Sequence, residues 1–261
     1  MEIADLQKGL ILVINGSELV EEGAGFGVPI AKYSDTTLFS RKATVYVEEL
    51  DENAAVITKV FLLDSVSKKQ VHGAFINDKI YSAFHRTFEK AYLNRGNMRS
   101  IFDWIMRLRR TIGVETHFVN VSPRGKVTVR YLCYPNHIKV CADFSEVDMT
   151  SCQEILILNE QGATFFRKYR NGSAVLLDKK IGAWTRVDEE KAQFSDLEEH
   201  ISFSLGKRDS ATMYCGWEQV KDRFSWAGIT YALSPKTLIF NYTIQIKNSV
   251  TGNPGVASPN H

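Results

Sequence analysis

The chain has 261 residues, of which 44% are hydrophobic, 24% are charged and 11% are aromatic, and its formal net charge is +2. A chain of this length can bury about 75% of the surface that its unfolded form exposes, so it can fold without disulfides or a structural metal. The small net charge excludes a general electrostatic attraction to nucleic acid or to acidic membranes.

The apolar run at residues 10–14 is too short for the core of a signal peptide, and no segment approaches the length of a membrane span. The four cysteines show no C-x-x-C pairing and fall in strand-like patterns, which favours buried, reduced thiols. These observations predict a cytoplasmic protein without membrane contact.

The N-terminal third shows short runs of alternating apolar and polar residues separated by turn residues, which is typical of a β meander. The expected strands lie at residues 9–15, 30–33, 36–39, 43–49 and 54–63.

Three glycines, Gly23, Gly25 and Gly27, precede the second of these strands. Residues 23–32 resemble the last glycine box of histidine-kinase-type ATP-binding domains, which would imply backbone amides that approach a phosphate. The asparagine and aspartate–glycine motifs that come before this box in that family are missing here. We therefore interpret the glycines as a tight bend or bulge between strands.

The pattern changes at residues 78–112, where apolar residues recur every three or four positions and predict an amphipathic helical insert. Residues 79–110 carry eight basic and two acidic residues, a net charge of +6. Arg99, Arg107, Arg109 and Arg110 could bind an acidic protein or nucleic acid by Coulomb attraction. The other interpretation is a solvated helix face that pairs with acidic loops elsewhere in the chain.

Alternation with a period of two returns after Gly113 and continues to residue 247, with Val127, Val129 and Tyr131 on one face of their strand. The expected strands lie at residues 115–121, 126–134, 137–144, 154–158, 164–169, 174–177, 183–187, 201–205, 211–216, 228–233 and 237–247. Asn171-Gly172 is a hairpin turn signal.

Many short strands with hairpin-length links favour an all-β fold, namely a large antiparallel β-sandwich or supersandwich-like fold. This architecture resembles the two-sheet sandwiches of the aldose-epimerase and polysaccharide-lyase kind. We expect one domain over residues 1–247 that includes the helical insert, and a disordered tail over residues 248–261, which are rich in Gly, Pro, Ser and Asn.

Tryptophans that lie among ionisable residues are the best candidates for a functional site. An indole ring packs on the C–H face of a sugar, while arginine and carboxylates hold its hydroxyls. This pattern predicts a carbohydrate-binding protein whose substrate-binding residues are Trp184, Trp217, Arg223 and Trp226. The competing interpretation is that these tryptophans fill the core.

Epimerase, hydrolase or lyase chemistry on a sugar would also need groups that move protons. Glu218 or Glu160 could act as a general base, and His117 or His200 as the acid. The sequence shows no metal-ligand spacing, nucleophile motif or cofactor motif. It therefore leaves open whether the protein is an enzyme or a non-enzymatic interaction or scaffold module.

Overall fold

A computed structural model of the chain describes residues 9–14, 17–19, 25–34, 36–40, 43–51, 54–63, 66–71, 115–119, 122–220 and 224–249. The helical insert predicted at 78–112, with the four arginines proposed to bind an acidic partner, lies outside the described residues, and so does nearly all of the predicted tail. In the described residues, no helix is long and apolar enough to cross a membrane.

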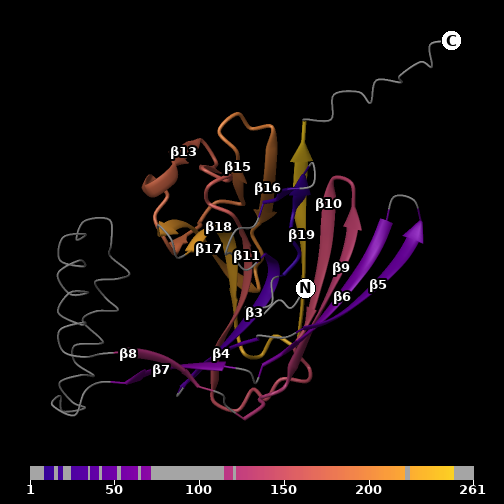
Figure 1. Ribbon diagram of the computed structural model, residues 1–261, viewed down its shortest axis with the longest axis vertical. Helices are drawn as coiled ribbons and strands as arrows, with labels where there is room; N and C mark the ends of the chain where they lie inside the picture. Colours follow the sequence, from indigo (N-terminus) through magenta and orange to yellow (C-terminus); the bar gives the residue numbers. More distant parts are fainter. Residues whose placement is uncertain are drawn as a thin grey trace.

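The structure is an antiparallel β-sandwich, which confirms the predicted fold class (Figure 1). One sheet has nine strands in the order β13, β12, β15, β16, β19, β10, β9, β6, β5. Their bounds are Ala174–Leu177, Lys168–Asn171, Lys191–Ser195, Ile201–Gly206, Ile239–Asn248, His137–Asp143, Lys126–Tyr134, Ala54–Leu62 and Ala43–Asp51.

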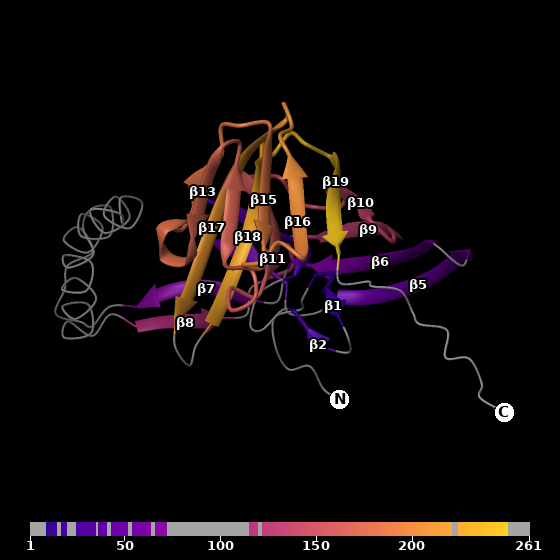
Figure 2. The same cartoon turned by 90° about the horizontal axis from the view of Figure 1, so that it is seen from above.

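The other sheet has eight strands in the order β14, β17, β18, β11, β3, β4, β7, β8. Their bounds are Thr185–Arg186, Ala211–Val220, Phe224–Leu233, Cys152–Gln161, Phe26–Tyr33, Thr37–Phe39, Val66–Val71 and Glu115–Val119. A separate short pair joins β1 (Val13–Ile14) to β2 (Ser17–Glu18). Hairpins β5–β6 and β7–β8 extend from opposite sides of the molecule (Figure 2).

The core lies between the two sheets and consists of the inward-facing positions that alternate along the strands. Val127, Val129 and Tyr131 of β9 are all fully buried, as the two-residue period predicts. Tyr231 of β18 packs edge-to-face on Tyr242 of β19, with ring centroids 5.1 Å apart, and so joins the two sheets. Each large side chain buried in this way contributes about 1.5–3 kcal/mol to stability.

Gly27, the last glycine of the cluster, lies at a bulge, in agreement with the sequence interpretation. The pairing of β3 with β11 shifts register between Leu158 and Asn159, opposite Gly27, whose φ of +79° disfavours any residue with a side chain. A Cβ atom on Gly27 would lie 2.5 Å from the hydroxyl oxygen of Tyr131. Glycine is therefore required here because a tyrosine occupies the space beside the backbone.

A buried polar network closes this bulge. The Asn159 side-chain oxygen accepts hydrogen bonds from the Gly27 backbone N–H (3.2 Å) and the Tyr242 hydroxyl (2.8 Å). The Tyr131 hydroxyl donates to the Phe26 carbonyl at 2.8 Å. Asn159 is fully buried, so the network satisfies polar groups that water does not reach.

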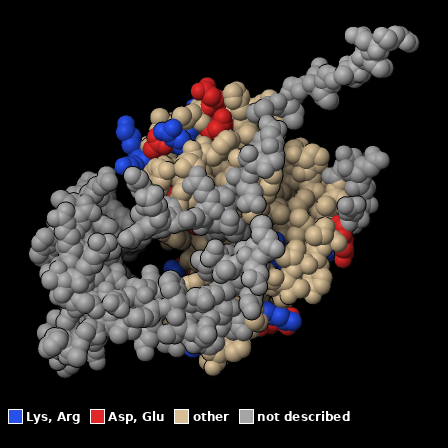
Figure 3. Space-filling model, in the orientation of Figure 1, with Lys and Arg blue, Asp and Glu red and all other residues tan. Residues whose placement is uncertain are grey.

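Charged side chains on the described surface are mixed in sign. Figure 3 shows the described Lys, Arg, Asp and Glu side chains of one face in small groups that contain both signs. Examples of such pairs are Lys32 with Glu154 at 2.7 Å and Lys126 with Glu146 at 2.9 Å. The four cysteines are free thiols.

Candidate functional site

Residues 217–220 and 224–227, which lie between two strands expected from the sequence, form the paired ends of β17 and β18. The two strands pair along their whole length, with Glu218 opposite Trp226 and Trp217 opposite Ala227. The connecting residues 221–223, which include Arg223, lie outside the described residues. Because successive side chains of a strand point to opposite faces, this hairpin divides the predicted site residues between two environments.

Three half-buried aromatic side chains, Trp184, Tyr214 and Trp226, form what we term the outer aromatic cluster, on the sheet face that points away from the nine-stranded sheet. The ring centroid of Trp184 lies 6.0 Å from that of Trp226 and 6.5 Å from that of Tyr214. The Trp226 ring covers Gly216, where an added Cβ would lie 2.4 Å from the indole. Trp184 has a φ of +57°, an uncommon value for a residue with a side chain.

The two predicted catalytic glutamates lie on the same face as this cluster. Glu218 follows Gly216 by two positions on β17, and Glu160 of β11 pairs with Gly228 of β18. A Cβ on Gly228 would lie 2.8 Å from the Glu160 side chain, so glycine makes room for that carboxylate. Glu160 is buried, with 7% of its surface exposed. The structure therefore brings together four of the eight predicted site residues, Trp184, Trp226, Glu160 and Glu218.

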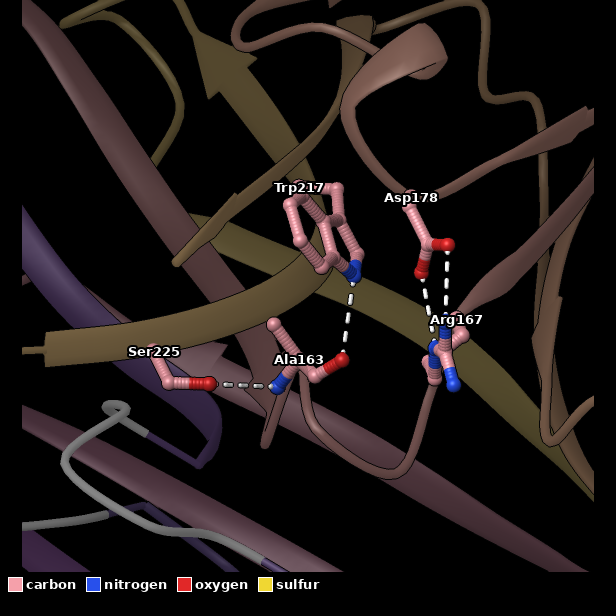
Figure 4. A network of polar contacts seen from close by, with 5 residues as sticks. All are labelled: Ala163, Arg167, Asp178, Trp217 and Ser225. Carbon is pink, nitrogen blue, oxygen red and sulfur yellow. Dashed lines mark hydrogen bonds and ion pairs between the residues drawn. The ribbon is translucent and has the colours of Figure 1, made fainter. Parts of the chain in front are cut away.

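Trp217 points to the opposite face and is almost buried, with 6% of its surface exposed. Its indole N–H donates a hydrogen bond of 3.1 Å to the carbonyl of Ala163, and the N–H of Ala163 donates to the Ser225 hydroxyl at 3.0 Å (Figure 4). These two hydrogen bonds fix the indole and the chain beside it, so Trp217 is held in one orientation.

A pocket of about 770 Å³ opens beside Trp217, and we term it the Trp217 pocket. Arg167 and Asp178 form a bidentate ion pair there, with distances of 2.8 Å and 2.9 Å from the Nε and Nη2 atoms to the two carboxylate oxygens. In Figure 4 this planar pair lies beside the indole of Trp217. The polar and charged residues that line the pocket are Thr164, Arg167, Asp178, Lys179, Lys180 and Gln219.

The electrostatics of the pocket are dominated by this ion pair. Hydrogen bonds from Arg167 hold the pKa of the Asp178 carboxyl below its usual value. Asp178 is therefore an ionised acceptor at neutral pH and a poor proton donor. Its backbone φ of +49° places it in the left-handed region, at the start of the short 3₁₀ helix η2 (Asp178–Lys180).

The two predicted histidines belong neither to the outer aromatic cluster nor to the Trp217 pocket. His117 lies on β8 at the far edge of the eight-stranded sheet, and its side chain lies outside the described residues. His200 precedes β16 in the other sheet, is exposed, and has its Nδ1 atom 3.7 Å from an Asp196 oxygen. Among the described residues, no group of three or more His, Cys, Asp and Glu side chains could hold a metal ion.

Arg167 and Asp178 were not predicted as site residues, although the hairpin signal at Asn171-Gly172 indicates that they are neighbours. The Asn171-Gly172 turn pairs Asn171 with Ala174 and Lys168 with Leu177. One further step along the same register brings position 167 opposite position 178. The hairpin turn therefore predicts an Arg–Asp pair that their separation along the chain hides.

Comparisons with known proteins assign no family to the chain. No family model matches it, and the search of curated proteins found no match. Among solved structures, the Slr1438 protein from Synechocystis sp. PCC 6803 aligns over 82% of this chain and 73% of its own, with 6% sequence identity and a TM-score of 0.32. A similarity this low carries no argument about fold or function.

Proposed function

We propose that this protein binds a saccharide in the Trp217 pocket and acts as a binding protein. The observation that carries the proposal is the fixed indole of Trp217 beside the bidentate Arg167–Asp178 pair in one pocket. The volume of about 770 Å³ lies within the range of about 300–1,000 Å³ that is usual for small-molecule sites.

Each part of the pocket suits one part of a sugar. Trp217 is part of the pocket lining and offers an apolar contact to the C–H groups. Arg167 retains N–H groups that point away from Asp178, and the carboxylate retains lone pairs, so the pair can donate to one hydroxyl and accept from its neighbour. Thr164 and Gln219 supply neutral donors and acceptors at the same pocket.

The arrangement favours binding over catalysis. Proton transfer requires a group whose pKa lies near the working pH, whereas the pKa of Asp178 is lowered by Arg167. Of the described residues that line the pocket, Asp178 is the single carboxylate. Glu160 and Glu218 lie on the opposite face of the eight-stranded sheet.

The first test is a tryptophan-fluorescence titration with glucose, galactose, N-acetylglucosamine and glucuronate at millimolar concentration. The variant Arg167→Gln is expected to weaken the tightest of these at least about tenfold, because it removes charge-assisted hydrogen bonds that contribute roughly 1.5–3 kcal/mol. Glu218→Gln is the matched control, since its side chain points away from the pocket, and it is expected to bind as the wild type does.

Two results would contradict the proposal. One is the absence of any fluorescence or calorimetric response to all four sugars. The other is binding that survives Arg167→Gln and is lost in Trp226→Ala, which would place the sugar on the outer aromatic cluster.

A further inference from the structure

A second pocket, of about 450 Å³, lies on the nine-stranded sheet, on the face that points away from the core. It shares no residue with the Trp217 pocket. We term it the cationic groove and define it by Arg130, Lys139, Cys141, Arg208, Asn241 and Thr243.

The strand register builds the floor of this groove. Cys141 of β10 pairs with Arg130 of β9 on one side and with Asn241 of β19 on the other. Lys139, two positions earlier on β10, pairs with Leu132 and Thr243 in the next row. These side chains share one face because they occupy equivalent positions of the pleat.

Arg208 reaches the groove from a different element. β16 ends at Gly206 after its last pair with β19, Leu205 with Ile244. Arg208 lies in the turn that follows and lines the pocket beside Asn241. The groove therefore combines the outward face of β9, β10 and β19 with a residue from the turn after β16.

The charges of the groove are unbalanced. Three cations, Arg130, Lys139 and Arg208, line it, and none of the described residues that line it is acidic. Within the described part of the chain, none of the three takes part in an ion pair, although Lys139 lies over the Tyr134 ring at 5.6 Å. Asp143 lies one row further along β10, where its carboxylate accepts the Ser145 N–H at 2.8 Å.

Like charges on neighbouring strands repel one another and destabilise the sheet. Several described surface cations elsewhere in this chain have acidic partners, such as Lys168 and Arg170 with Glu199. A pocket that gathers three cations without such a partner lacks the anion that would balance them.

We propose that the cationic groove binds a small molecule that carries a phosphate or sulfate group. The guanidinium groups of Arg130 and Arg208 bind the oxyanion by donating paired N–H hydrogen bonds, and the Lys139 ammonium attracts it as a point charge. The Asn241 amide and the Thr243 hydroxyl donate to further oxygens. Leu132 offers an apolar contact to the remainder of the ligand.

The thiol of Cys141 gives this proposal a local readout, because it lies on the floor between Arg130 and Asn241. The test uses inorganic pyrophosphate as the probe, at constant ionic strength, with N-ethylmaleimide labelling followed by peptide mass spectrometry. Pyrophosphate is expected to slow labelling of Cys141 severalfold and to leave Cys152, which is also half-buried, unchanged.

Calorimetry with two variants completes the test. Arg130→Gln and Arg208→Gln are each expected to weaken pyrophosphate binding at least about tenfold, through the loss of charge-assisted hydrogen bonds. The matched control Lys236→Gln removes an exposed cation outside the groove and is expected to change nothing. Binding unaffected by both arginine variants, or no heat together with unchanged labelling of Cys141, would overturn the proposal.

Phosphate and sulfate esters share the chemistry that the groove recognises. The same titration with ATP and with N-acetylglucosamine 6-sulfate separates the two sources, and the tighter ligand identifies the class. Because the groove and the Trp217 pocket share no residue, Arg167→Gln is expected to leave pyrophosphate binding intact. The saccharide proposal for the Trp217 pocket and the oxyanion proposal for the cationic groove can therefore fail independently of each other.

Discussion

Asn159→Leu is expected to lower the free energy of unfolding by about 2–6 kcal/mol, because it leaves two buried donors without an acceptor, each at a cost of about 1–3 kcal/mol. Those donors are the Gly27 N–H and the Tyr242 hydroxyl, which both bond to the Asn159 oxygen. Leucine has the same number of side-chain heavy atoms and the same branching as asparagine, so the substitution removes the polar groups and keeps the outline of the side chain. Urea denaturation followed by far-ultraviolet circular dichroism measures the change.

The control for this prediction lies on the same strand. Gln153 of β11 is exposed, and Gln153→Leu is expected to change stability by less than about 0.5 kcal/mol, as is usual for surface positions. A loss of the same size in both variants would show that β11 tolerates no leucine for reasons unrelated to the network. A negligible loss in Asn159→Leu would contradict the network's role at the bulge.

Alkaline unfolding is the second large effect that the structure predicts. Burial raises the pKa values of Tyr131, Tyr231 and Tyr242 well above that of a free tyrosine. Their folded-state pKa values exceed the unfolded value of about 10, so stability is unaffected below pH 10 and falls as the pH rises above it. The fall is about 1.4 kcal/mol per pH unit for each tyrosine, or roughly 4 kcal/mol for the three together.

Burial also raises the pKa of the Cys215 thiol to about 11, so this group begins to oppose folding at a lower pH, above its ordinary value of 9.0. A domain of ordinary stability, about 5–15 kcal/mol, should therefore unfold cooperatively within a few pH units above pH 10. The experiment records circular dichroism and tyrosinate absorbance against pH. Both signals are expected to change together, and Tyr242→Phe is expected to flatten the pH dependence.

The prediction would be contradicted if all tyrosines ionised with a midpoint near pH 10, as judged by the full tyrosinate absorbance, while the circular dichroism stayed unchanged. Such a result would show that the buried hydroxyls ionise without unfolding and hence that water reaches them in the folded protein.

The sequence pattern was sufficient for the fold class, because alternation has a direct physical cause in the pleat of a strand. Ile138, Val140 and Ala142 fall on the buried face of β10 as predicted. The same alternation is too short to predict a strand at β15. This strand contains two inward apolar residues, Ala192 and Phe194, between polar neighbours, and no strand was expected there.

Strand ends were the main source of error at the candidate site. β17 and β18 continue to Val220 and Phe224, beyond the predicted limits at 216 and 228, because pairing between the strands stabilises polar residues that alternation alone does not mark. Extending the strands divides Trp217 and Glu218 between two faces. Trp217 and Glu218 were predicted from the sequence to belong to one site. Their division between two faces depends on where the turn between β17 and β18 lies, and the alternation pattern does not give that position.

The central claim, that the Trp217 pocket holds a sugar, is tested most directly by a crystal structure of the protein soaked in the tightest sugar from the fluorescence titration. We expect electron density for the sugar in the pocket, with its C–H groups against Trp217 and hydroxyls within hydrogen-bond distance of both Arg167 and Asp178. Density for the sugar on the outer aromatic cluster, or an empty pocket at saturating sugar, would contradict it.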